Sequence, residues 1–175
     1  GCLVVDGNEM NFLVSEDFKD IYFIDVDSYK TPNFKPTAYN PNTLDPLIKK
    51  ENFNTGSDWY IFGILFFQIV LGSHPFKGVY TGTSMSFGKK DIEKRMKMGI
   101  SILNPKIKLN KAVREISIIS IKMREWLDST FKNEKRSKPP LVSKEIISNR
   151  SEIDYFNLPN GFKVYESETF TSCID

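Results

Sequence analysis

The stretch Trp59–Leu71 constrains the fold more than any other part of the chain, because its apolar residues fall on every face of a helix. A helix that is hydrophobic all round is buried all round. Gly72 follows the stretch and is expected to stop the helix, and Pro75 is expected to prevent its restart. The pattern therefore predicts a central helix around which the rest of the core packs.

The residues just before this stretch carry a helix-start signal. Ser57 or Thr55 can cap the helix, since a side-chain oxygen there can accept an otherwise unpaired backbone N–H. Asp58 lies at the positive end of the helix dipole, where a carboxylate is stabilised. We therefore expect Asp58 to have a structural role at the helix N-terminus.

Composition limits the class of protein. At 175 residues the chain has the length of about one domain, and 40% hydrophobic with 26% charged residues predicts a soluble globular protein rather than a disordered or fibrous one. A net charge of +2 gives no strong field for nucleic acid. The longest apolar run, Tyr60–Phe67, is far shorter than the roughly 20 residues of a membrane span, so no membrane partner is expected.

The counts of cysteine and histidine exclude several kinds of site. Cys2 and Cys173 alone make neither a disulfide framework nor a zinc site, so we expect a reducing compartment and a cytoplasmic location. A single histidine, His74, leaves little room for a Ser-His-Asp or Cys-His mechanism. We expect His74 to be structural, in the turn at the end of the central helix.

The other elements are expected to be short, and the fold class is α+β, mainly helical, with a small β-hairpin sheet. Residues between Ser28 and Thr55 include four prolines and form no single helix or strand. The apolar pieces near the N-terminus predict strands, and periodic stretches later in the chain predict helices. The expected strands are Leu3–Val5, Phe12–Val14 and Ile21–Ile24, the helices are Lys89–Met98, Glu115–Phe131 and Leu141–Ser148, and Phe76–Gly88 and Ser101–Asn110 are a loop and an extended stretch.

Four polar residues on the opening hairpin are candidates for chemistry. Asp6 and Asn11 are five positions apart on one loop, and Asp25 and Asp27 end the following strand. Phosphoryl transfer needs such a set, because an Asp can accept the proton of a hydroxyl while amide and carboxylate oxygens are the ligands that Mg²⁺ prefers. Each residue could instead be a turn former that bonds its own backbone.

The ordered motifs resemble the protein-kinase superfamily. Asp6–Asn11, followed by an apolar strand, is similar to the D-x-x-x-x-N catalytic loop, and Asp25–Asp27 is similar to the metal-binding D-F-G segment. Ser57–Gly63 and Gly72–Phe76 are similar to the two ends of the kinase central helix. These sequence motifs most resemble those of a bacterial and phage kinase-like family linked to stress-response operons.

The resemblance implies a set of roles. Residues 1–149 would be a kinase-like carboxyl-terminal lobe, with ATP and Mg²⁺ as cofactors, and 150–175 a tail or the start of a further unit. Asp6, as the base, and Asn8 would be the catalytic residues. Asn11 and Asp25 would bind the nucleotide through Mg²⁺, and Asp27 would be a possible third ligand. Asp58 would anchor the backbone of the catalytic loop. Ser28–Pro46 would be the activation segment, closed by an ion pair between Asp45 and Arg136.

The chain also departs from the family pattern. Asn8 stands at the catalytic-loop position where kinases carry Lys, and it offers no positive charge to a phosphate. Asp27 replaces the Gly of the metal motif and adopts that residue's backbone angles less easily. Val4-Val5 replaces His-Arg before the catalytic Asp. These differences keep a pseudokinase scaffold open as an alternative to an enzyme.

No Gly-rich phosphate loop and no strand Lys paired with a helix Glu is present in the sequence. The chain begins at Gly1 with an apolar run, so we expect a piece of a longer polypeptide whose amino-terminal lobe is missing here. That polypeptide is expected to transfer phosphate to Ser or Thr hydroxyls of a protein, or, alternatively, to a small-molecule alcohol. The piece alone is expected to be inactive.

Overall fold

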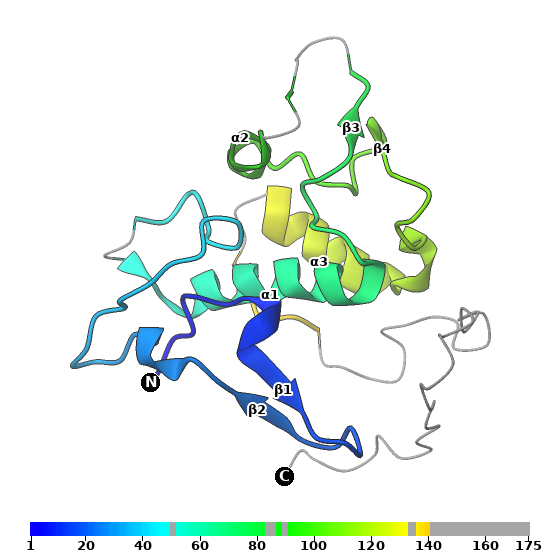
Figure 1. Ribbon diagram of the computed structural model, residues 1–175. Helices are drawn as coiled ribbons and strands as arrows, with labels where there is room; N and C mark the ends of the chain where they lie inside the picture. Colours follow the sequence, from blue (N-terminus) through cyan, green and yellow to red (C-terminus); the bar gives the residue numbers. More distant parts are fainter. Residues whose placement is uncertain (50–51, 83–86, 89–90, 133–135, 141–175) are drawn as a thin grey trace.

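The computed structural model describes residues 1–49, 52–82, 87–88, 91–132 and 136–140, and within them the fold is mixed α+β. Three α-helices and two two-stranded antiparallel sheets are joined by long irregular segments (Figure 1). The helices are α1 (Thr55–Leu71), α2 (Ile92–Lys97) and α3 (Ile121–Lys132), and the strands are β1 (Phe12–Val14), β2 (Ile21–Phe23), β3 (Val79–Tyr80) and β4 (Ile107–Lys108). The predicted helix Leu141–Ser148 and the predicted unit 150–175 lie outside the described residues.

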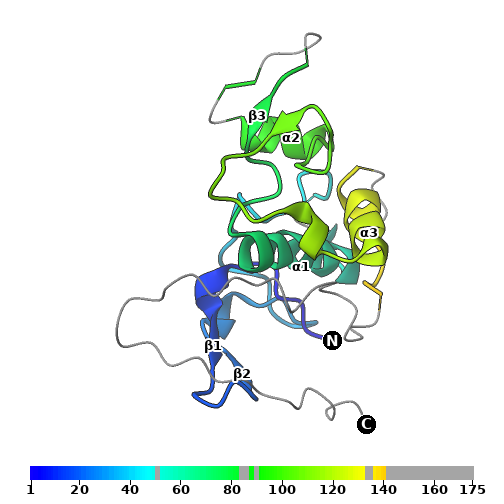
Figure 2. The ribbon, with the colours of Figure 1, turned by 90° about the vertical axis from the view of Figure 1, so that its right-hand side faces the viewer.

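Helix α1 is central, as its composition predicts. Its buried side chains include Tyr60, Ile64 and Phe67, which are fully enclosed. The β1–β2 hairpin lies on one side of α1, and the β3–β4 sheet and α2 lie on the opposite side, in both views (Figures 1 and 2). The prediction of burial on every face is only partly confirmed. Ile69 in the last turn is 67% exposed, and four more apolar residues of the helix are only partly buried: Trp59, Phe62, Phe66 and Val70.

Both ends of α1 have defined caps. The N-cap is Asn54, whose side-chain oxygen accepts the backbone N–H of Gly56 at 2.8 Å. The prediction of Ser57 or Thr55 as the cap is therefore wrong. Ser57 instead completes a capping box, since its hydroxyl accepts the Asn54 N–H at 3.2 Å. The predicted stop is confirmed at Gly72, which has φ of +71°, a left-handed conformation that favours glycine.

Helix α3 packs on α1 through aromatic side chains. The Phe131 ring lies 5.6 Å from that of Tyr60, 5.8 Å from that of Phe67 and 5.2 Å from that of Phe76. The predicted range Glu115–Phe131 is too long at its start, because a 3₁₀ turn occupies Ile116–Ile118. The apolar residues that recur at helical spacing in this range are nevertheless all buried: Ile119, Met123, Trp126 and Leu127.

The predicted β1–β2 hairpin is confirmed, with Phe12 opposite Phe23 and Val14 opposite Ile21, although β2 ends at Phe23, one residue earlier than predicted. The predicted strand Leu3–Val5 is wrong as a strand, since it makes only one isolated bridge, between Leu3 and Lys30. The backbone N–H groups of Val4 and Val5 instead donate to the side chain of Asp58 on α1.

The second sheet was not predicted. Strand β3 lies in the expected loop and pairs with β4, Tyr80 opposite Ile107. Arg95 supports this region from α2, because its guanidinium donates to the backbone oxygens of Ile100, Gly78 and Lys77. Helix α2 is shorter than the predicted Lys89–Met98, of which residues 89 and 90 are outside the described part.

The segment between η2 (Val26–Ser28) and α1 is irregular, as its prolines predict. Within the described residues, no helix combines the length and the hydrophobicity that a membrane span requires.

Candidate functional site

The candidate site begins where α1 holds the N-terminal segment. The Asp58 carboxylate accepts the backbone N–H of Val4 at 3.0 Å and that of Val5 at 3.3 Å. Val5 is fully buried with φ of +53°, a left-handed conformation that is unusual for a β-branched residue. Asp58 therefore fixes the backbone immediately before Asp6. The predicted anchoring contact of Asp58 is confirmed.

The loop from Asp6 to Asn11 is closed by its own side chains. Asn11, 5% exposed, donates from its side-chain nitrogen to the Asp6 backbone oxygen at 3.1 Å. Asn8 donates to the Asn11 side-chain oxygen at 3.1 Å and accepts the Met10 N–H at 2.7 Å. Asn8 therefore orients Asn11, and both of its polar side-chain atoms are engaged within the loop.

A backbone contact links this loop to the second bend. The Ile24 N–H donates to the Asn11 carbonyl oxygen at 3.0 Å, which places Asp25 directly after the contact. Asp25 has φ of +58°, and the Ser28 hydroxyl donates to its backbone oxygen at 3.3 Å. The left-handed residue turns the chain from β2 into η2, so Asp25 and Asp27 stand at the same corner.

The three aspartates of the two bends act on one another electrostatically. The pKa of Asp25 is raised above its ordinary value, first by a hydrogen bond to the Asp27 carboxyl and then by the negative charge of Asp27. Slight desolvation and the charge of Asp6 raise it further. The Asp25 carboxyl is thus influenced mainly by Asp27 of its own bend, and the Asp6 charge on the other bend is the smallest of the causes.

The chemistry of this group fits Mg²⁺ bound together with phosphates. Carboxylates at Asp25 and Asp27 and the amide oxygen of Asn11 are hard oxygen ligands, and the crowded negative charge at Asp25 favours a cation. Among the described residues, no three His, Cys, Asp or Glu side chains are gathered as a metal site. Mg²⁺ usually takes only one or two carboxylates and completes its shell with phosphate and water, so the predicted set of two carboxylates and an amide suits that mode.

The turn at residues 40–45 touches the loop from the other side. The Thr43 hydroxyl, almost fully buried, donates to the Gly7 backbone oxygen at 2.7 Å. This contact was not predictable, since nothing in the local sequence distinguishes Thr43 from other threonines. It joins the irregular segment to the residue that follows Asp6.

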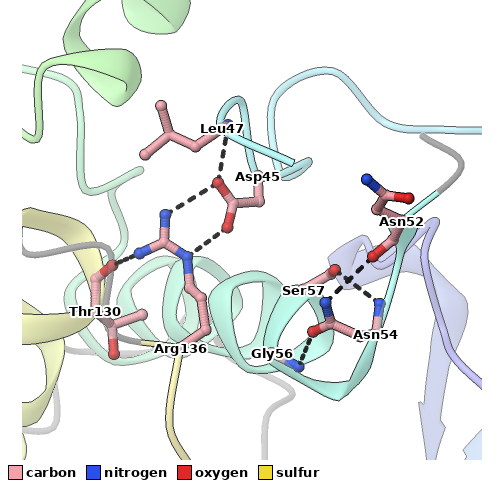
Figure 3. A network of polar contacts seen from close by, with 8 residues as sticks. All are labelled: Asp45, Leu47, Asn52, Asn54, Gly56, Ser57, Thr130 and Arg136. Carbon is pink, nitrogen blue, oxygen red and sulfur yellow. Dashed lines mark hydrogen bonds and ion pairs between the residues drawn. The ribbon is translucent and has the colours of Figure 1, made fainter. Parts of the chain in front are cut away.

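The predicted ion pair between Asp45 and Arg136 is confirmed. The Arg136 guanidinium makes two contacts with the Asp45 carboxylate, one through Nε and one through Nη2 at 3.0 Å (Figure 3). The Asp45 side chain is completely buried and that of Arg136 is 10% exposed. Arg136 also donates to the Thr130 backbone oxygen and lies 4.6 Å from the centre of the Tyr60 ring. This pair fastens the irregular segment to both long helices.

Comparison with known proteins adds no relative. No protein-family model matches the chain, and no curated protein matches it. The resemblance to kinases rests on the sequence motifs alone.

Proposed function

We propose that this chain is the carboxyl-terminal lobe of a kinase-type phosphotransferase that uses ATP and Mg²⁺. In the longer polypeptide it would transfer phosphate to Ser or Thr hydroxyls of a protein. The observation that carries the proposal is the junction of the two bends, where Asn11 holds the Asp6 carbonyl oxygen through its side chain and the Ile24 N–H through its backbone. One residue therefore couples the proposed base to the proposed metal ligand Asp25.

Asp6 is suited to the role of base. Its side chain is half-buried, and Asp58 and Asn11 hold the backbone on either side of it through Val4, Val5 and the Asp6 carbonyl. A carboxylate held in this way can accept the proton of an incoming hydroxyl as the oxygen attacks phosphorus.

Asn11, Asp25 and Asp27 are the residues that would hold Mg²⁺. The metal ion, when bound, neutralises charge on the phosphates during transfer. The side-chain nitrogen of Asn11 donates to the Asp6 backbone oxygen, so the side-chain oxygen is the atom that would bind the metal ion. That oxygen already accepts from Asn8 and keeps a second lone pair for a metal ion.

The β1–β2 hairpin supports the expectation of a missing lobe. Large apolar side chains on both of its faces are exposed, and a two-stranded hairpin is marginal by itself. An exposed apolar patch of this kind marks a contact surface. We assign it to the amino-terminal lobe of the same polypeptide. The patch consists of Leu13, Val14, Phe18, Ile21, Tyr22, Phe23, Ile24 and Val26.

A pseudokinase scaffold is the second candidate, and one observation favours it. Asn8 carries no charge, and both of its polar side-chain atoms already contact the loop, at Met10 and Asn11. A site without a cation at this position stabilises a transferring phosphate less, and such a module could bind nucleotide without turnover.

The deciding experiment measures Mg²⁺-dependent ATP turnover by the full polypeptide and its Asp25→Ala variant. Asp20→Ala, which removes an exposed carboxylate at the far end of the same hairpin, is the matched control. We expect loss of turnover in Asp25→Ala alone. Equal turnover in all three proteins contradicts the assignment of Asp25, and nucleotide binding without turnover in the parent supports the scaffold.

A second measurement identifies the acceptor. Transfer of label from γ-labelled ATP to protein, located on Ser or Thr by mass spectrometry, supports the proposed substrate class. Label found in a small alcohol, with none in protein, replaces it with a small-molecule kinase.

A further inference from the structure

His74 lies beyond the end of α1, is 4% exposed, and uses both ring nitrogens. Nε2 is 2.7 Å from the Asn42 backbone oxygen, and Nδ1 accepts the Phe76 N–H at 3.2 Å. A carbonyl oxygen can only accept and an amide N–H can only donate. The ring is therefore neutral, with its proton on Nε2.

The residue that His74 holds belongs to a compact turn. The N–H groups of Thr43 and Leu44 both donate to the Asn40 backbone oxygen, at 3.1 and 2.9 Å. The next contact along the chain is that of the Thr43 hydroxyl with Gly7. A short path of hydrogen bonds thus runs from the α1 end to the residue after Asp6.

We propose that the neutral imidazole of His74 is a positioning residue for the site: it holds the 40–44 turn through Asn42, and thereby holds the Gly7 carbonyl through Thr43. The inference rests on the proposed function only in treating Gly7 as part of the catalytic loop. The physical claim concerns the turn and can be tested without turnover.

The surroundings favour the neutral ring. Lys77 and Arg95 repel a positive charge at His74, while Glu9 and the contact with Asn42 favour it. Burial opposes a positive charge on the ring, and its effect is larger than that of any of these neighbours. A protonated ring would also set an Nδ1–H against the Phe76 N–H, so the observed arrangement needs the uncharged form.

Two matched variants test the two hydrogen bonds of the His74 ring separately. A Gln side chain reaches about as far as Nε2 and can donate to Asn42, whereas an Asn side chain ends near Nδ1 and can only accept from Phe76. We expect His74→Gln to preserve the hydrogen-exchange protection of the Thr43 and Leu44 amides. His74→Asn should lower that protection about tenfold, the effect of losing one buried hydrogen bond.

The Phe76 amide is the internal control, since it should keep its protection in His74→Asn and lose it in His74→Gln. The Gly7 carbonyl ¹³C shift should move only in His74→Asn. A purely packing role for the ring predicts equal effects of the two variants on Thr43 and Leu44, and that result overturns the proposal.

The wild-type chain provides a test that needs no variant. Long-range ¹H–¹⁵N spectra at neutral pH should show the tautomer with Nε2 protonated, and a proton on Nδ1 instead contradicts the proposal. Neither readout depends on phosphate transfer. Loss of the exchange pattern therefore rejects the role of His74, whereas absence of ATP turnover in the full polypeptide rejects the proposed function.

Discussion

The Asp58 carboxylate on α1 accepts the backbone N–H of Val4, 54 positions earlier in the chain, at 3.0 Å. Its second oxygen accepts the neighbouring N–H of Val5. A helix that the sequence marks as the core thus also fixes the backbone of the candidate site. Loss of this contact should therefore lower the stability of the fold.

Asp58→Asn should lower the free energy of unfolding by about 1–3 kcal/mol, because an amide has one acceptor oxygen and leaves a part-buried N–H unpaired. Urea denaturation at pH 7 measures the change. Asp20→Asn, on an exposed side chain, should stay within about 0.5 kcal/mol of wild type. Equal effects of both substitutions are inconsistent with the anchoring contact.

The raised pKa of Asp25 depends on its neighbour. Because the hydrogen bond and charge of Asp27 are its two largest causes, Asp27→Asn should lower the Asp25 pKa toward the ordinary value. Carboxyl ¹³C shifts followed through an NMR titration measure it. Asp20→Asn should leave the Asp25 pKa unchanged, and an unchanged pKa in Asp27→Asn shows that the two carboxyls do not interact.

Removing one partner of the Asp45–Arg136 pair should be costly. Arg136→Ala leaves the fully buried Asp45 carboxylate without its guanidinium, and a loss of about 3–5 kcal/mol in unfolding free energy is expected. The exposed pair Lys19–Asp17 is the control, since Lys19→Ala should cost about 0–1 kcal/mol. Both values come from urea denaturation, and similar costs for the two pairs contradict the burial argument.

The stability of the chain should fall on mild acidification because of His74. Burial is the main cause that lowers its pKa in the folded state, so the unfolded chain binds a proton more readily. Stability is therefore greatest above the unfolded pKa of about 6.5 and decreases as the pH falls from there toward the folded value, with a slope of at most about 1.4 kcal/mol per pH unit.

Denaturation midpoints between pH 7.5 and 5.5 test this expectation against His74→Gln, which has no titrating ring. The variant should show a flatter profile over this range. A slope in the variant equal to that of wild type assigns the pH dependence to other groups.

The sequence predicted the parts of the fold that depend on local pattern. Helix α1 was predictable because a stretch of this length and apolar composition is stable only as a buried helix. The β1–β2 hairpin was predictable because two apolar runs flank a polar turn. Strands β3 and β4 have two residues each, too short for a period, and their pairing depends on contacts distant in sequence. The start of α3 was misplaced because Ile116–Ile118 is apolar but forms a 3₁₀ turn.

The contacts of the candidate site also differ in how far they could be predicted. The contacts among Asp6, Asn8 and Asn11 follow from their spacing on one loop. The contacts of Thr43 and His74 join segments more than 30 positions apart, and single-residue types carry no signal for such pairs. Of the distant contacts that hold this region, the sequence therefore indicated those that the kinase resemblance implies, at Asp58 and between Asp45 and Arg136. It gave no sign of the contacts of Thr43 and His74.

Gly7 offers the most direct test of how closely the site is packed on α1. A Cβ at this position would lie 2.3 Å from Cγ2 of the buried Ile61, far inside van der Waals contact. Gly7→Ala should therefore lower the free energy of unfolding by about 1–3 kcal/mol, the usual range for overpacking. Ile61→Ala removes the opposing methyl group, so the same substitution in that background should cost less. A double-mutant cycle by urea denaturation measures the difference, and strictly additive costs would mean that Gly7 and Ile61 are not in contact.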